Sequence, residues 1–364
     1  MRVLTITILA ALGSLQAVAA QVIAGKTIWV DEATCGPWAK SNSFPSAAGP
    51  GGLFTTAYDI IDKMVNANSY RIYYPSTQSP TKLPANVLAW ERYRLNSTYS
   101  AFFGNNTATT SISGGPLGVS DIASSLYGVN AVWGPGTLPP SPIVVCDDAP
   151  YVSNNSSSGR FVFTDPYHHL PVELTGDRIQ TDGITKPCAT NGQSGYSYSH
   201  SGNKFSFQNI IFCTKNMKLP LGFTSNGPTA FASGTTLDVA GKTWLGAFYT
   251  QALWNGGGVG IFGNNTLAYG YAASHAMRND RNSVFNPDSH KFFSFAQMFD
   301  GLFWGSGVGR TSQQEYAGLQ KTAVGREIIS AFGLTNIAVP ARGINWAPSI
   351  LNADFPNVPA IPTA

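Results

Sequence analysis

Charged residues are scarce in this sequence. Lys, Arg, Asp and Glu make up only 11% of the 364 residues, and the net charge at pH 7 is +3. A nucleic-acid-binding surface needs clustered lysines and arginines, and no basic cluster occurs along the chain. No apolar run reaches the roughly 20 residues that span a bilayer as a helix. We therefore expect no nucleic-acid partner and no membrane span.

Histidine and the common catalytic motifs are also scarce. The chain has 5 histidines, and none lies between His200 and His275. It has no Gly-x-Ser-x-Gly motif, no P-loop, and no Gly-x-Gly-x-x-Gly placed between a strand and a helix. Glutamate occurs at only five positions, and the sequence does not show whether two carboxyl groups lie close enough for glycoside hydrolysis. No complete hydrolase signature is present.

The N-terminus has the features of a secretory signal peptide. Met1-Arg2 is basic, an apolar run extends to Leu15, and small residues at positions 17–20 suit cleavage by signal peptidase. Residues 1–20 are therefore predicted to be a signal peptide, with the mature chain beginning near Gln21. The protein is expected to be secreted and extracellular.

Cysteines and glycosylation motifs agree with secretion. The 4 cysteines are even in number, which suits an oxidising compartment. We favour pairing Cys188 with Cys213 and Cys35 with Cys146, although four cysteines allow three connectivities. Five Asn-x-Ser/Thr sequons make N-glycosylation possible where they are exposed. They are at Asn96, Asn105, Asn154, Asn155 and Asn264.

The hydrophobic pattern predicts an α+β fold with helices concentrated in the C-terminal half. Helices are expected over residues 53–66, 86–103, 243–254, 269–277, 287–303 and 312–332. Strands are expected over residues 28–31, 143–145, 161–163, 195–198 and 209–213, and residues 35–52 read as a Ser/Pro/Gly-rich loop. Residues 21–347 form one predicted domain with a possible internal boundary near 150–160, and residues 348–364 form a proline-rich tail.

Two of the predicted helices have clear start signals. Asn286-Pro287 supplies an N-cap followed by a proline at the first helical position. Ser312 and Glu315 have the spacing of a capping box, and Gly333 is a helix stop.

Several segments, in this order, resemble a known family of secreted zinc peptidases. They are residues 29–66, 99–104, 210–213, 263–273 and 286–293. Together they are similar to the fungal deuterolysin-like and lysine-specific metallo-endopeptidases, the aspzincins. The resemblance covers about half of the chain and implies a zincin-like metallopeptidase scaffold with an N-terminal helical, loop-rich elaboration.

The zinc ligands that the resemblance implies are missing. In the family, an HExxH helix supplies two histidines, because residues i and i+4 share one helix face, and its glutamate activates the metal-bound water. The corresponding window, residues 244–255, contains no His, Asp or Glu, and the third ligand, an aspartate, corresponds to Thr266. Tetrahedral zinc needs His, Cys or carboxylate ligands. We therefore expect this window to be a core helix and no metal or other cofactor to be bound.

These observations favour a secreted, glycosylated, non-catalytic relative that binds an extracellular protein or polysaccharide. The alternative is an enzyme, either a zinc endopeptidase or another hydrolase, with a relocated site built from His275, Asp288 and His290. A third possibility is a structural component of a cell wall or matrix.

Overall fold

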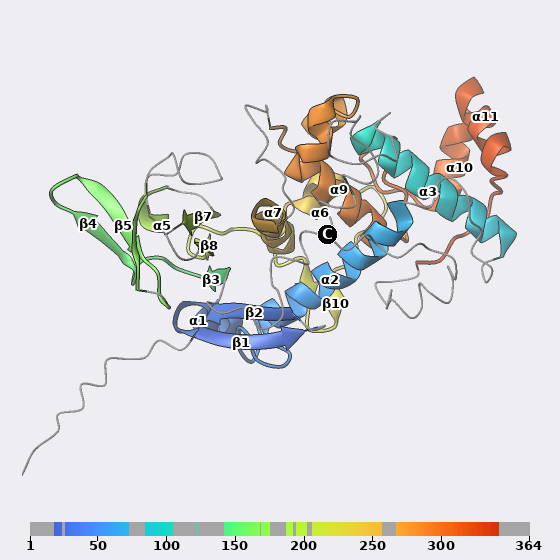
Figure 1. Ribbon diagram of the computed structural model, residues 1–364. Helices are drawn as coiled ribbons and strands as arrows, with labels where there is room; N and C mark the ends of the chain where they lie inside the picture. Colours follow the sequence, from blue (N-terminus) through green and yellow to red (C-terminus); the bar gives the residue numbers. More distant parts are fainter. Residues whose placement is uncertain are drawn as a thin grey trace, which may run out of the picture.

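The computed structural model describes residues 18–23, 26–72, 84–104, 122, 142–167, 169–174, 187–191, 194–201, 206–256 and 267–341. Over this part the fold is mixed α+β (Figure 1). The strands are β1 (Val18–Ile23), β2 (Lys26–Asp31), β3 (Ile143–Val145), β4 (Val152–Asn155), β5 (Arg160–Thr164), β6 (Pro171–Glu173), β7 (Gly195–Ser201), β8 (Ser206–Phe212), β9 (Phe223–Thr224) and β10 (Gly227–Pro228). The helices are α1 (Glu32–Ser41), α2 (Leu53–Ile72), α3 (Ala85–Phe103), α5 (Cys188–Asn191), α6 (Leu237–Gly241), α7 (Trp244–Gly256), α8 (Tyr271–Ala276), η1 (Arg281–Phe285, a 3-10 helix), α9 (Pro287–Met298), α10 (Ser312–Gln320) and α11 (Ala323–Phe332).

The main sheet has the strand order β1-β2-β3-β8-β7. The three inner strands run parallel, whereas β1 and β7 pair antiparallel at the two edges. The central strand β3, Ile-Val-Val, is buried along its whole length, as expected of a strand covered on both faces. Because side chains alternate along a strand, Val144 and Ile210 face one core while Ile143 and Ile211 face another.

The larger core lies between this sheet and helices α2, α7 and α9. Several of its rings meet edge to face, for example Trp244 and Phe54 at a centroid distance of 5.2 Å. The helix α9 is buried along nearly its whole length and contacts α2, α3, α6 and α7. It therefore fixes the positions of the elements that surround the candidate site.

The opposite face of the sheet carries a smaller core. This core includes Phe163 and Val172 from the second, three-stranded sheet, whose order is β4-β5-β6, and Tyr151, which directly precedes that sheet. That sheet begins at Val152, inside the range 150–160 where the sequence places a possible internal boundary. In Figure 1 it lies at one end of the molecule, and α10 and α11 lie at the other end.

The two disulfides join the pairs that the sequence favoured. Cys35 in α1 is bonded to Cys146 just after β3, and Cys188 in α5 is bonded to Cys213 just after β8. Both bonds anchor a helix to the end of a parallel strand.

The expected loop over residues 35–52 is wrong in its first part, where α1 forms. Gly36-Pro37 suggested a turn, but Asp31 caps the helix by accepting hydrogen bonds from the backbone N–H groups of Ala33 and Thr34. Cys35, bonded to Cys146, then fixes the helix against β3. Tertiary contacts outweigh the local turn signal here.

The expected single helix over residues 312–332 is two helices, α10 and α11. The hydroxyl of Thr322 accepts a hydrogen bond from the backbone N–H of Gly325 at 2.9 Å and so starts a new helix. A Cβ on Gly325 would lie 2.0 Å from the carbonyl oxygen of Leu319, so the close approach of the two helices requires glycine.

Three expected helix boundaries also differ. The capping box of α10 is formed by Thr311 and Gln314 instead of Ser312 and Glu315. The hydroxyl of Ser312 instead donates to the carbonyl of Ile337. The helix α9 ends at Met298, five residues before the expected end at 303, and α2 extends beyond the expected end at 66 to Ile72.

Some predictions lie outside the described residues. These are most of the signal peptide, Thr266, the tail at 348–364, and the sequons at Asn105 and Asn264. Val18–Ile23 forms β1, so the last residues of the predicted signal pair with β2. Among the helices the structure describes, none combines the length and the hydropathy of a membrane-spanning segment.

Candidate functional site

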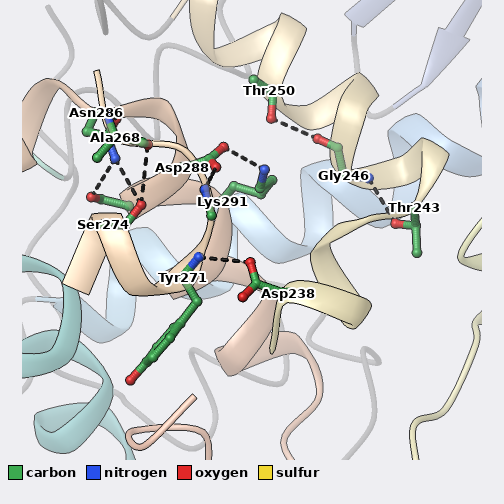
Figure 2. Close-up of polar contacts among 12 residues, drawn as sticks. Asp238, Thr243, Gly246, Thr250, Ala268, Tyr271, Ser274, Asn286, Asp288 and Lys291 are labelled. Atoms are coloured by element: carbon green, nitrogen blue, oxygen red, sulfur yellow. Dashed lines mark hydrogen bonds and ion pairs between the residues drawn. The ribbon is translucent and has the colours of Figure 1, made fainter. Parts of the chain in front are cut away.

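A pocket of about 440 Å³ opens where the edge strand β7, the helix α7 and the start of α9 meet. Apolar and glycine positions form part of its wall, and hydroxyl, amide and charged side chains form the rest. Its lining residues are Ser194, Gly195, Phe212, Leu219, Gly241, Lys242, Thr243, Ala247, Thr250, Gln251, Tyr269, Asp288 and Lys291. Figure 2 shows the Asp288–Lys291 pair facing the side of α7 that carries Thr250.

The helix α7 coincides with the window where the sequence placed the lost metal helix. Trp244, Phe248 and Tyr249 are fully buried in the larger core, so the expectation of a core helix is confirmed. Ala247, Thr250 and Gln251 occupy the pocket side of the helix and are half-buried. Positions 247 and 251 share one face, the relation that two metal-binding histidines would need, but here they are alanine and glutamine.

The hydroxyl groups of Thr243 and Thr250 are hydrogen-bonded to the backbone of α7. The Thr243 hydroxyl accepts a hydrogen bond from the backbone N–H of Gly246 at 3.2 Å and so caps the helix. The Thr250 hydroxyl donates to the carbonyl of Gly246 at 2.9 Å. Figure 2 shows both contacts on the wall opposite Asp288. Neither hydroxyl is placed as an activated nucleophile, because each has a backbone partner instead of a base.

An ion pair forms the α9 side of the pocket. Asp288 Oδ1 lies 2.5 Å from the Nζ of Lys291, and the two side chains are only 8% and 13% exposed. Asp288 Oδ2 accepts a hydrogen bond from the backbone N–H of Gly270 at 2.7 Å. The carboxylate thus connects the first turn of α9 to the turn before α8. Asp288, which follows the α9 start signal Asn286-Pro287, is therefore both part of the first turn of α9 and part of the pocket lining.

Three further hydrogen bonds, made by the side chains of Asp238 and Asn286, hold the segment behind this ion pair (Figure 2). The backbone N–H of Tyr271 donates to Asp238 Oδ1 at 2.9 Å, which fixes the start of α8 against α6. The side chain of Asn286 accepts from the backbone N–H of Ala268 and donates to the hydroxyl of Ser274. The backbone on that side of the pocket is therefore positioned by side chains from α6 and from the residue preceding α9.

The structure does not bring the three residues of the relocated-site hypothesis together. His275 Nδ1 lies 2.8 Å from the carbonyl oxygen of Ala101. His290 is fully buried, with Nε2 2.7 Å from the carbonyl oxygen of Val284 and its ring beside Phe103. Of the three, only Asp288 lines the pocket. Across the described ranges, no three His, Cys, Asp or Glu side chains form a group that could hold a metal ion.

Burial sets the protonation state of His290. Desolvation lowers its pKa from 6.5 to about 4, and the contact with the carbonyl of Val284 opposes the shift only partly. The imidazole is neutral at physiological pH, and its buried position makes it a structural residue.

Of the sequons in the described part of the chain, two have an exposed asparagine. Asn96 is exposed on α3, and Asn154 is exposed on β4. Asn155 is half-buried, and its amide donates to Glu173 at 3.4 Å. Glycosylation of these positions stays a prediction.

The sequence pointed to Asp288 but missed most of the pocket. Lys242, Thr250, Gln251 and Lys291 are common residue types without a motif, and their segments are far apart in sequence. Only the resemblance to the zinc-peptidase metal helix over residues 244–255, together with the missing ligands, drew attention to α7.

Comparison with known proteins finds no family model that matches the chain, no similar curated protein and no similar solved structure.

Proposed function

We propose that this is a secreted, non-catalytic binding protein that takes an extended segment of an extracellular protein at the pocket beside β7. The observation that carries the proposal is the position of the pocket at the first residues of an edge strand. Ser194 and Gly195 line the pocket, and in the described part of the chain β7 pairs only with β8. The outer edge of such a strand offers backbone donors and acceptors to an added peptide strand, and an adjacent pocket takes one of its side chains.

The composition of the pocket supports binding over catalysis. The residues of α7 that line it are Ala247, Thr250 and Gln251, which cannot serve as zinc ligands or as a carboxylate base. Asp288, the one carboxylate among the described lining residues, is bonded to Lys291 and to the backbone N–H of Gly270. The two disulfides are in accord with an extracellular location.

The proposal includes a zincin-like scaffold. The features that support it are the parallel strands β2, β3 and β8, the antiparallel edge strand β7, and a helix, α7, that packs on β7. In this proposal the scaffold keeps a peptide-binding groove while its metal-binding positions carry neutral side chains.

A pocket-filling variant tests the proposed function. Purified protein is incubated with a random library of blocked octapeptides, and retained peptides are quantified by mass spectrometry. Ala247→Phe places a ring in the pocket and should lower peptide retention about tenfold, because a blocked pocket forfeits at least one anchor contact. Ala323→Phe, on exposed α11, makes the same change far from the pocket and should bind like the wild type.

Measurements of bound zinc and of peptide hydrolysis can contradict the proposal. The proposal is wrong if the purified protein holds stoichiometric zinc and hydrolyses the same peptides in a chelator-sensitive way. It is also wrong if wild-type protein retains no peptide, or if Ala247→Phe folds normally and binds as tightly as the wild type. Retention on insoluble polysaccharide in place of peptides would favour the carbohydrate partner that the sequence left open.

A further inference from the structure

The charges that line the pocket do not balance. Lys242 and Lys291 are positive, and among the described lining residues Asp288 is the only negative one. Asp288 and Lys291 neutralise each other at 2.5 Å with little exposure to solvent. Lys242 therefore contributes a net positive charge to the pocket.

Lys242 is placed to meet a ligand. It follows α6 directly, its side chain is exposed, and within the described residues it forms no ion pair. The nearest acidic residue on the same helix, Asp238, accepts a hydrogen bond from the backbone N–H of Tyr271 at 2.9 Å. Lys242 is thus the cation at the pocket whose position suits an incoming anion.

Tyr269, at the opening of the pocket, also suits a peptide ligand. Tyr269 also lines the pocket, and 60% of its surface is exposed, which is unusual for a large ring in this protein. Exposed tyrosines provide rigid contact area at binding sites because they combine an apolar ring with a polar end. Lys242 and Tyr269 therefore present a charge and a ring at the same opening.

We infer that the partner segment is acidic, and that one of its Asp or Glu side chains enters this pocket and pairs with Lys242. This inference rests on the proposed peptide-binding function and names the class of peptide. The ion pair forms at a partly exposed position, so it contributes to specificity and to the rate of association more than to affinity. The buried Asp288–Lys291 pair stays intact, and Asp288 excludes a second carboxylate by like-charge repulsion.

Positional peptide libraries test the inference. The probes are blocked octapeptides with random flanks and a central Glu, Gln or Lys, so that the side chain is the only designed charge. Wild-type protein should retain the Glu library about tenfold better than the Lys library, with Gln between them. The preference should shrink as salt is raised, because screening weakens an exposed pair.

A charge swap provides the decisive variant. Lys242→Glu should reverse the order, so that the Lys library binds better than the Glu library. Lys321→Glu makes the same charge change at an exposed position after α10, and it should keep the wild-type order. Circular dichroism and thermal unfolding confirm that both variants fold.

The outcomes separate this inference from the proposed function. If Ala247→Phe abolishes binding but Glu, Gln and Lys libraries bind equally, or Lys242→Glu changes nothing, the acidic specificity is wrong and peptide binding stands. A preference for the Lys library in wild-type protein would also overturn it, and would assign the pocket's selectivity to Asp288. If no library binds at all, or if polygalacturonate binds in its place, the proposed peptide-binding function fails together with the inference.

Discussion

At the scale of single residues, His290 shows how burial alters the chemistry of an apparent site residue. The carbonyl oxygen of Val284 can only accept a hydrogen bond, so Nε2 of His290 carries the proton. Nδ1 is buried and has no hydrogen-bond partner among the residues that the structure describes. Protonation of Nδ1 would place an unpaired charge in the core, which is why the pKa falls to about 4.

This shift predicts a loss of stability in acid. The unfolded chain binds the histidine proton near pH 6.5, more tightly than the folded protein. His290 therefore costs no stability above pH 6.5 and destabilises the fold progressively as the pH falls toward 4. The full effect is about 3 kcal/mol, since one pKa unit corresponds to about 1.4 kcal/mol.

His290→Gln tests this effect, because glutamine keeps a donor for Val284 and does not titrate. Urea unfolding at pH 7 and pH 4 should show that the variant loses about 3 kcal/mol less than the wild type on acidification. Carboxylates elsewhere contribute equally to both proteins. An identical loss in variant and wild type would show that His290 does not govern acid stability.

At the scale of elements, local pattern predicted most helices and strands but not all of their limits. Strand β3 and helix α7 were predicted within two residues, because an apolar run or a helical apolar face marks each of them. The helix α1 was missed because Gly36-Pro37 is a turn signal, and Cys35 outweighs it only through a bond to a residue 111 positions away. A contact between residues so far apart cannot be predicted from a short stretch of sequence.

The two disulfides are expected to differ in their effect on stability. They close loops of 111 and 25 residues, and a longer loop restricts the unfolded chain more. The entropy of loop closure predicts a stabilisation of about 5 kcal/mol by Cys35–Cys146 and about 3.5 kcal/mol by Cys188–Cys213.

Replacing each pair with alanine and measuring the free energy of unfolding in denaturant tests this order. Both pairs are buried, so replacing either one should cost a similar amount of packing energy. The difference between the two losses of unfolding free energy then measures the difference in loop-closure entropy. The Cys35→Ala/Cys146→Ala variant should be the less stable by about 1 kcal/mol. Equal or reversed losses would contradict the loop argument and point to residual structure in the unfolded chain.

At the scale of the whole molecule, two buried Tyr–Asp hydrogen bonds join the layers on either side of the smaller core. On the side of the three-stranded sheet, the hydroxyl of Tyr151 donates to Asp31 and that of Tyr196 donates to Asp148, at 2.8 and 2.6 Å. Both carboxyl groups are fully buried. These pairs hold the β4–β6 layer and the edge strand β7 against the ends of β2 and β3.

Asp148 is predicted to weaken the fold as the pH rises. Desolvation raises its pKa, although hydrogen bonds from Tyr196 and the backbone N–H of Cys188 partly oppose the shift. A raised pKa means that the folded state holds the proton more tightly. The resulting stability is present below the unfolded value of 3.8 and is lost as the pH rises through the folded value.

Asp148→Asn removes this titration and keeps an oxygen that accepts from Tyr196. The free energy of unfolding of the variant, relative to the wild type, should increase from pH 3 to pH 7. Asp147→Asn is the matched control, because Asp147 pairs with exposed Lys215 at 2.8 Å and lies nearer the surface. A variant-to-wild-type difference that is constant with pH would rule out ionisation of Asp148 as the cause.

The pocket itself could not be predicted from the sequence. It joins residues near 194, 212, 242, 250, 269 and 288, which come from the edge strand β7, the end of β8, the residues beside α6 and before α8, the helix α7 and the start of α9. Asp288 drew notice as part of a helix start, yet its contact with the backbone N–H of Gly270 depends on packing between α8 and α9. Sequence pattern identified the elements, and their assembly created the site.

The contacts of Asp288 with Lys291 and with the backbone N–H of Gly270 form when the chain folds. An arriving ligand therefore meets a wall that needs no organisation. In the proposed complex the ordering entropy is lost by the incoming segment and by exposed side chains such as Lys242, so stiffening that segment should strengthen the complex more than stiffening this wall would.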